Sequence, residues 1–126
     1  ILLLDTGFAK LWLRPDLSLR IDLVEDITLL EASYETAAAS YSLGSPIHIE
    51  ASFDTSAISL HLNDVAQSLS LVGGSPLTES SIGTLRNYTG LSSIGFGLVG
   101  DIYLPYLGSG LRNPADRTAF YTDLVV

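Results

Sequence analysis

The sequence predicts an all-β fold of mostly antiparallel strands, with one or two short helices. The first observation is a period of two: hydrophobic and polar residues alternate along several short segments. The second is a set of turn-forming residues between those segments, at Gly44-Ser45-Pro46, Asn63-Asp64, Gly73-Gly74-Ser75-Pro76, Gly108-Ser109-Gly110 and Asn113-Pro114. The third is composition, because 126 residues of which 47% are hydrophobic suffice for one sizeable core. We therefore expect a single β domain over residues 1–126, for which a β-sandwich or barrel is one architecture.

Each element follows from its own pattern. Residues 1–13 contain two apolar runs, each rich enough to form a buried strand, and Trp12 in the second run is expected in the core. Segments 17–23, 47–53 and 58–62 alternate strictly and are predicted to be half-buried strands. Segment 26–42 is a candidate helix, because four of its large or apolar residues share a helical face.

Composition also excludes several classes of function. A net charge of −8 offers no basic surface for phosphates, so the sequence predicts no nucleic-acid partner. No apolar run approaches the roughly 20 residues of a membrane-spanning helix. The chain has no cysteine and two histidines, His48 and His61, which lie on polar faces of predicted strands and are expected to be exposed. The sequence therefore predicts neither a metal site nor a cofactor.

Two features point to a processed, secreted protein. The chain begins at Ile1 and contains no methionine, so we expect a fragment or a processed part of a longer chain. Asn87-Tyr88-Thr89 is an acceptor triplet for an N-linked glycan. We therefore predict a glycoprotein with Asn87 as the glycosylation site, located outside the cell or in the secretory pathway.

Asp5 is the leading candidate for a functional residue. It lies between two apolar runs, and burying an unpaired carboxylate is costly unless hydrogen bonds or chemistry require it. Asp5 is therefore either a turn residue or a catalytic group.

A family resemblance favours the catalytic interpretation. Asp5-Thr6-Gly7, followed by Leu11-Trp12-Leu13, resembles the active-site loop of pepsin-like aspartic peptidases. Leu98-Val99-Gly100-Asp101 is similar to a second motif that follows in the carboxy-terminal lobe of that family. Phe8 stands where the family has Ser or Thr, and residues 117–120 resemble the closing strand of the lobe.

The resemblance implies a secreted aspartic endopeptidase that acts on peptides. Asp5 would supply one carboxylate of a pair that shares a proton, with Thr6 and Gly7 supporting it through a hydroxyl and a backbone N–H. Leu98, Val99 and Gly100 would form the strand behind the loop. A second lobe or a symmetric copy would supply the other carboxylate, so the isolated lobe would be inactive.

A non-enzymatic interpretation remains open. An acidic, cysteine-free β chain also suits a structural or assembly subunit, such as a sheath, fibre or capsid-associated protein, whose edge strands pair with neighbours. A buried Asp5 loop braced by residues 98–100 would support the peptidase lobe. An exposed turn at Asp5 would support the structural subunit.

Overall fold

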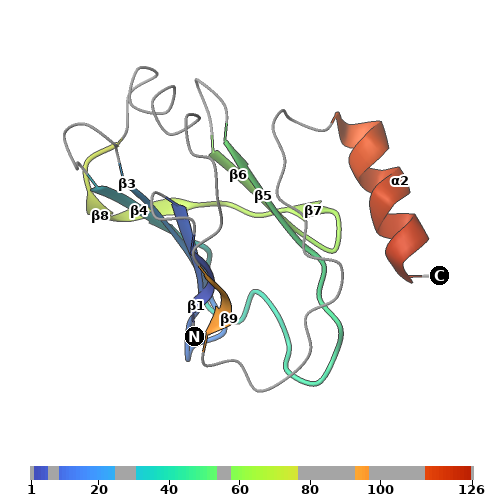
Figure 1. The fold of residues 1–126 in the computed structure, drawn as a ribbon, viewed down its shortest axis with the longest axis horizontal. Helices are drawn as coiled ribbons and strands as arrows, with labels where there is room; N and C mark the ends of the chain where they lie inside the picture. The colour runs from blue at the N-terminus through green and yellow to red at the C-terminus, as the bar shows by residue number, and fades with distance from the viewer. Residues whose placement is uncertain are drawn as a thin grey trace.

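The computed structural model describes residues 2–5, 9–24, 31–53, 58–76, 93–96 and 113–125. These residues form two antiparallel sheets and one helix (Figure 1). The predicted all-β fold of mostly antiparallel strands is therefore confirmed.

The larger sheet has six strands in the order β8-β4-β3-β2-β1-β9, and all neighbouring strands are antiparallel. The first four strands of the chain are neighbours in sequence order, whereas β8 and β9 occupy the two edges. The strands are β1 (Leu2–Asp5), β2 (Ala9–Leu13), β3 (Leu19–Val24), β4 (Glu31–Glu35), β8 (Ser70–Gly74) and β9 (Ser93–Phe96).

The smaller sheet has three strands, β5 (Ile49–Phe53), β6 (Ile58–Leu62) and β7 (Val65–Ala66). Asn63 and Asp64 join β6 to β7 with φ angles of 49° and 66°. Two consecutive positive φ angles are typical of the tight hairpin turn that Asn and Asp tolerate. The turn predicted at these residues is therefore present.

The core lies between the two sheets, and the period of two decides which residues enter it. Leu19, Ile21 and Leu23 of β3 are 0%, 4% and 0% exposed, while the residues between them face the other side of the sheet. Leu60 and Leu62 of β6 complete the same cluster from the smaller sheet. Removing this apolar surface from water is the main stabilising contribution to the fold.

The predicted strand positions are confirmed with small shifts at their ends. β6 has the predicted bounds, whereas β3 and β5 begin two residues later than predicted. Leu17 has a φ of +63° and lies in the turn before β3, so it cannot belong to an extended strand. Before β5, the backbone N–H of His48 donates to the side-chain oxygen of Asn63 at 2.9 Å.

The helix predicted over 26–42 is wrong in its described part. Residues 31–35 form β4, which pairs with β3 on one side and with β8 on the other. Two sets of interstrand hydrogen bonds and the burial of Ala32, which is 0% exposed, outweigh the helical spacing. Residues 26–30 lie outside the described residues.

The prediction of a closing strand over 117–120 is also wrong, because these residues belong to helix α2 (Pro114–Val125). Asn113 caps the helix, since its side-chain oxygen accepts the backbone N–H of Asp116 at 2.9 Å. Pro114 suits the first helical position, and Asp116 places a negative charge in the first turn. α2 lies beside the smaller sheet, on the side away from the larger one (Figure 1).

Trp12 was predicted to lie in the core, and this prediction is wrong. It pairs with Arg20 across the β2–β3 ladder and so faces away from the core, where it is half-buried. In the same strand, Leu11 is the residue that enters the core. Among the described residues, no helix is both long and apolar enough to cross a membrane.

Candidate functional site

Asp5 is the last residue of β1. It pairs with Lys10 of β2 on one side and with Ser93 of β9 on the other. Its side chain is 20% exposed, and its Oδ2 lies 3.9 Å from the Nζ of Lys10. Asp5 is therefore a largely buried strand-end carboxylate with a cationic neighbour.

A row of polar residues continues from Asp5 across the larger sheet. The register places Asp5, Lys10, Asp22 and Ser33 side by side on four successive strands. Arg20 donates hydrogen bonds to Asp22 and to Ser33. Its Nε lies 2.6 Å from Asp22 Oδ1, and its Nη2 lies 2.9 Å from Ser33 Oγ. We call Asp5, Lys10, Asp22 and Ser33 the polar row. Opposite charges alternate along it, and such cross-strand pairs stabilise a sheet.

Asp22 does not form a catalytic pair with Asp5. Two strand spacings of about 4.8 Å separate these residues, which places them roughly 10 Å apart. Carboxylates that share a proton lie about 3 Å apart. Because Arg20 also engages Asp22, the polar row contains one candidate catalytic carboxylate and not two.

The other residues implied by the resemblance are only partly tested by the structure. β9 ends at Phe96, two positions before Leu98, and β9 is hydrogen-bonded to β1. Ser93 lies opposite Asp5, and Phe96 lies opposite Leu2. The chain therefore moves away from Asp5 as it passes along β9 from Ser93 to Phe96. The remaining predicted residues lie outside the described residues: Thr6, Gly7, Leu98, Val99, Gly100 and the glycosylation site Asn87.

A second cluster of titratable groups lies between the smaller sheet and α2. His61 is 7% exposed, so the prediction of an exposed His61 is wrong. It pairs with Glu50 in the β5–β6 ladder, and the Asp64 turn follows it. Burial lowers the pKa of His61, and the Arg117 charge lowers it further, against the opposing effect of the two carboxylates.

Three side-chain contacts hold α2 over this cluster. Arg117 Nε lies 3.2 Å from Asp64 Oδ1, and the Thr118 hydroxyl donates to Asp64 Oδ2. The hydrogen bond from Thr118 is the main reason that the pKa of Asp64 lies below its usual range. The rings of His48 and Tyr121 approach with centroids 5.6 Å apart. Sequence reasoning missed this cluster, because its residues come from three separate stretches of the chain, 48–50, 61–64 and 117–121.

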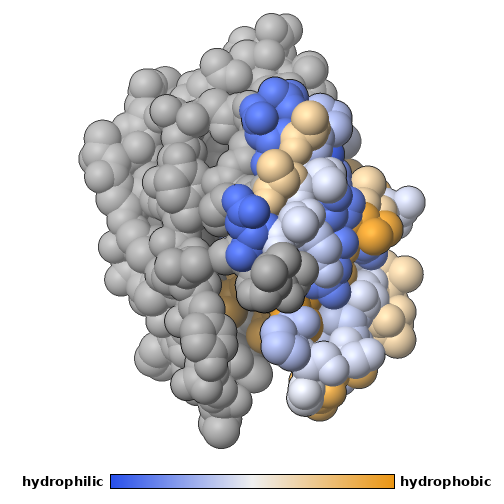
Figure 2. Space-filling model, turned by 90° about the vertical axis from the view of Figure 1, so that its right-hand side faces the viewer, coloured by the Kyte–Doolittle hydropathy of each residue, from blue (hydrophilic) through white to orange (hydrophobic). Residues whose placement is uncertain are grey.

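The outer surface over α2 is mixed in character. Figure 2 shows hydrophilic residues beside smaller hydrophobic areas on the described part of this side. Within the described part of the chain, no group of three or more His, Cys, Asp or Glu residues could hold a metal ion. The contacts of Arg117 and Thr118 with Asp64 join α2 to the smaller sheet.

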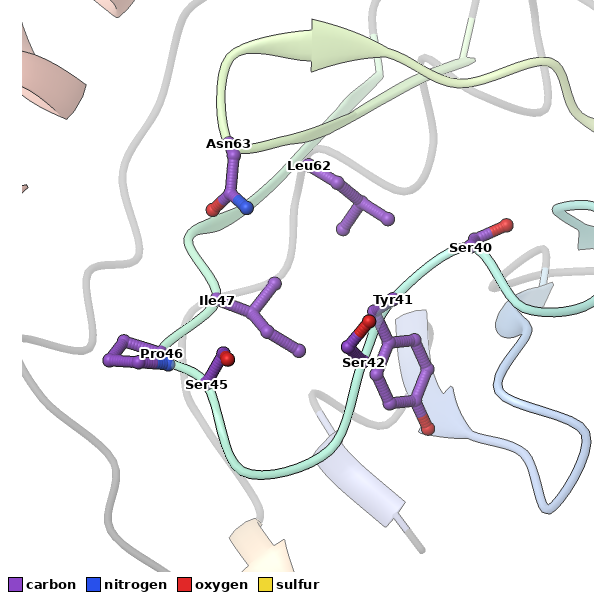
Figure 3. A pocket seen from close by; sticks show the side chains of 8 residues that line it. All are labelled: Ser40, Tyr41, Ser42, Ser45, Pro46, Ile47, Leu62 and Asn63. Atoms are coloured by element: carbon purple, nitrogen blue, oxygen red, sulfur yellow. The ribbon is translucent and has the colours of Figure 1, made fainter.

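A pocket of about 250 Å³ opens between the 40–47 loop and the end of β6. Figure 3 shows the side chains of Ile47 and Leu62 pointing into it, with serine hydroxyls around them. The Tyr41 hydroxyl donates to the carbonyl oxygen of Arg14 at 3.3 Å, and burial raises the pKa of Tyr41. Its lining contains no charged side chain: Ser40, Tyr41, Ser42, Ser45, Pro46, Ile47, Leu62 and Asn63. Tyr41 is the titratable side chain of this lining, and its hydroxyl is engaged with the carbonyl oxygen of Arg14.

We take Asp5 and its neighbours as the candidate site, because Asp5 is the carboxylate that the resemblance marks and its side chain is 20% exposed at a strand end. Comparison with protein-family models, with curated proteins and with solved structures finds no significant match.

Proposed function

We propose that this chain is one lobe of a secreted pepsin-like aspartic endopeptidase, in which Asp5 supplies one carboxylate of the catalytic pair. One observation carries the proposal: β1, which ends at Asp5, is hydrogen-bonded to β9, which ends two positions before Leu98. Asp5 and its partner Ser93 are 93 − 5 = 88 positions apart in the sequence. β1, whose last residue is Asp5, therefore lies beside β9, a strand that comes before the second motif in the chain.

The environment of Asp5 is compatible with acid–base chemistry. A side chain that is 20% exposed is partly shielded from water, which strengthens its electrostatic interactions. A second carboxylate brought close to it could not ionise at the same time, so the two would share one proton. One could then activate a water molecule while the other protonates the departing group.

The proposal requires a partner for Asp5. Asp22 is too distant and is engaged by Arg20, so the second carboxylate comes from a second lobe or a symmetric copy. Thr6 and Gly7 would support Asp5 through a hydroxyl and a backbone N–H, and residues 98–100 would hold the loop from behind. The substrate is a peptide, and the isolated chain is inactive.

The decisive experiment changes Asp5 in the complete enzyme. Asp5→Asn preserves shape but cannot carry the shared proton, so cleavage of a denatured protein at acidic pH should fall to background. Asp22→Asn is the matched control, because it removes the same charge from the same polar row and should retain activity. Thermal melting would verify that both variants remain folded.

Two results would contradict the proposal. The first is full activity of the Asp5→Asn enzyme. The second is turnover by the purified, strictly monomeric 126-residue chain, since a single carboxylate cannot serve as acid and base together.

A non-catalytic structural or assembly subunit is the second candidate. The observation that favours it is the 3.9 Å approach of Lys10 to Asp5, which gives this carboxylate an ordinary structural role in the β1–β2 hairpin. In that case Asp5→Asn would change the stability of the hairpin and affect no peptidase activity. The same variant therefore separates the two candidates.

A further inference from the structure

β8 is an edge strand with an apolar, accessible surface. Within the described residues it pairs with β4 on one side and with no strand on the other. Its Leu71 and Val72 side chains are 40% and 52% exposed. An edge strand presents backbone N–H and C=O groups that can pair with another strand. β8 therefore combines free backbone groups with exposed apolar side chains.

The absence of charge distinguishes β8 from a protected edge. Residues 65–76 contain no charged side chain, in a chain whose net charge is −8. Natural edge strands usually carry charged residues, often lysine, that discourage pairing. The β4–β8 ladder has one irregularity, which leaves Val72 without a partner in β4. Such a bulge can also protect an edge, but here the residue at the bulge is apolar.

We propose that β8 is a self-association surface, on which a second copy of this chain pairs its own β8 in an antiparallel arrangement about a twofold axis. A twofold interface uses the same segment from both copies, so an uncharged strand meets an uncharged strand. Elsewhere, the excess negative charge of two copies opposes their approach. Leu71 and Val72 of both copies would then lose contact with water, which favours association.

This association is separate from the partner that the proposed function requires. The strand order places β1 four positions from β8. In a sheet that continues through two β8 strands, nine strand spacings of about 4.8 Å would separate the two Asp5 residues, or roughly 40 Å. They could not share a proton at that distance. Loss of self-association and loss of the peptidase function are therefore distinguishable outcomes.

Sedimentation velocity of the 126-residue chain over a range of concentrations tests the proposal. The wild-type chain should shift from monomer to dimer as concentration rises, whereas Val72→Lys should remain monomeric. Leu43→Lys and Val65→Lys are matched controls, because they add the same charge at residues that are 78% and 62% exposed but lie outside β8. Both should dimerise as the wild type does, with unchanged circular dichroism.

The lack of native cysteine allows an independent measurement. Single-cysteine variants at Ser70, Leu71 and Val72 should form intermolecular disulfides under mild oxidation, most efficiently at the position closest to the twofold axis. Leu43→Cys should show only slow collisional cross-linking. A monomeric wild-type chain at all concentrations, or equal cross-linking at all four positions, would overturn the proposal. The proposal would also be overturned if Leu43→Lys or Val65→Lys dissociated the dimer as completely as Val72→Lys does.

Discussion

His61 shows how burial changes the chemistry of a single side chain. It is 7% exposed, and its Nδ1 atom is buried and has no hydrogen-bond partner among the described residues. Burial and the neighbouring Arg117 both favour the neutral imidazole, so the pKa of His61 lies below its ordinary value of 6.5. An unfolded chain would restore that ordinary value. Folding is therefore linked to the protonation of this residue.

We expect the stability of the chain to decrease as the pH falls through 6.5, the ordinary pKa of histidine. The unfolded chain takes up a proton there that folded His61 does not, so the contribution of neutral His61 is fully present only above that pH. Urea unfolding between about pH 7.5 and pH 5.5 measures the effect. His61→Gln should flatten the dependence, while His48→Gln serves as the control. An equal decline in the wild type and in His61→Gln would contradict this prediction.

Asp5 is the second residue whose role depends on its surroundings. The sequence alone offered a turn residue or a catalytic group, and the structure places Asp5 at a strand end where it is 20% exposed. The ladder partners Lys10 and Ser93 come from strands on either side. Partial burial at the end of a strand suits both candidate functions, which is why the Asp5→Asn experiment is needed to separate them.

At the scale of elements, the end of β8 shows how two glycines with similar backbone angles can differ in their requirement for glycine. Gly74 has a φ of +72°, and a Cβ built on it would lie 2.0 Å from the carbonyl oxygen of Glu31. Gly44 has a φ of +78° in a loop, and a Cβ there would meet nothing within 4 Å. Both positions favour glycine for backbone reasons, but only Gly74 also lacks space for a side chain.

The alanine variants of these glycines should therefore differ. Gly44→Ala should lower the free energy of unfolding by about 1–2 kcal/mol, the usual cost of a left-handed backbone angle. Gly74→Ala should cost clearly more, because its Cβ would also force β8 away from β4. Urea unfolding of both variants provides the measurement. If the two variants lost equal free energy of unfolding, β8 would be able to shift away from β4 at no cost in stability, and the prediction would be wrong.

β4 shows why element type can be misread from local spacing. The segment has apolar residues at helical intervals, yet it forms a strand between β3 and β8. Its hydrogen bonds connect it to β3 on one side and to the more distant β8 on the other, and a helical pattern cannot reveal such partners. α2 is the opposite case, because the cap formed by Asn113, Pro114 and Asp116 was visible in the sequence and could have predicted the helix.

At the scale of the whole molecule, the described elements form layers. The larger sheet packs against the smaller sheet through the shared leucine and isoleucine core, and α2 covers the other side of the smaller sheet (Figure 1). The two contacts differ in kind. The sheets meet through apolar side chains, whereas among the described contacts of α2 are the two polar contacts of Arg117 and Thr118 with Asp64. We therefore expect α2 to separate from the sheets more easily than the sheets separate from each other.

Asp64→Asn tests this difference. Asn tolerates the positive φ of the turn but removes the charge that Arg117 contacts, so α2 should open more often. Amide hydrogen exchange should accelerate in α2 by several-fold and remain unchanged in β2 and β3. Asp123→Asn is the control, because Asp123 is an exposed residue of the same helix. Equal exchange in the two variants would show that Asp64 does not hold α2.

The sequence by itself determined the fold class, the approximate positions of β3, β5 and β6, and the face of β3 that enters the core. The physical reason is local: a strand alternates its side chains between two faces, so one buried face leaves a period of two in the sequence. Only the tertiary structure decided that β9 lies beside β1, that residues 31–35 form a strand, and that α2 covers His61. Each of these depends on partners distant in the chain, whose positions no local pattern records. The candidate site divides in the same way, since Asp5 stands out in the sequence, whereas its burial and its neighbours Lys10 and Ser93 follow from strand pairing.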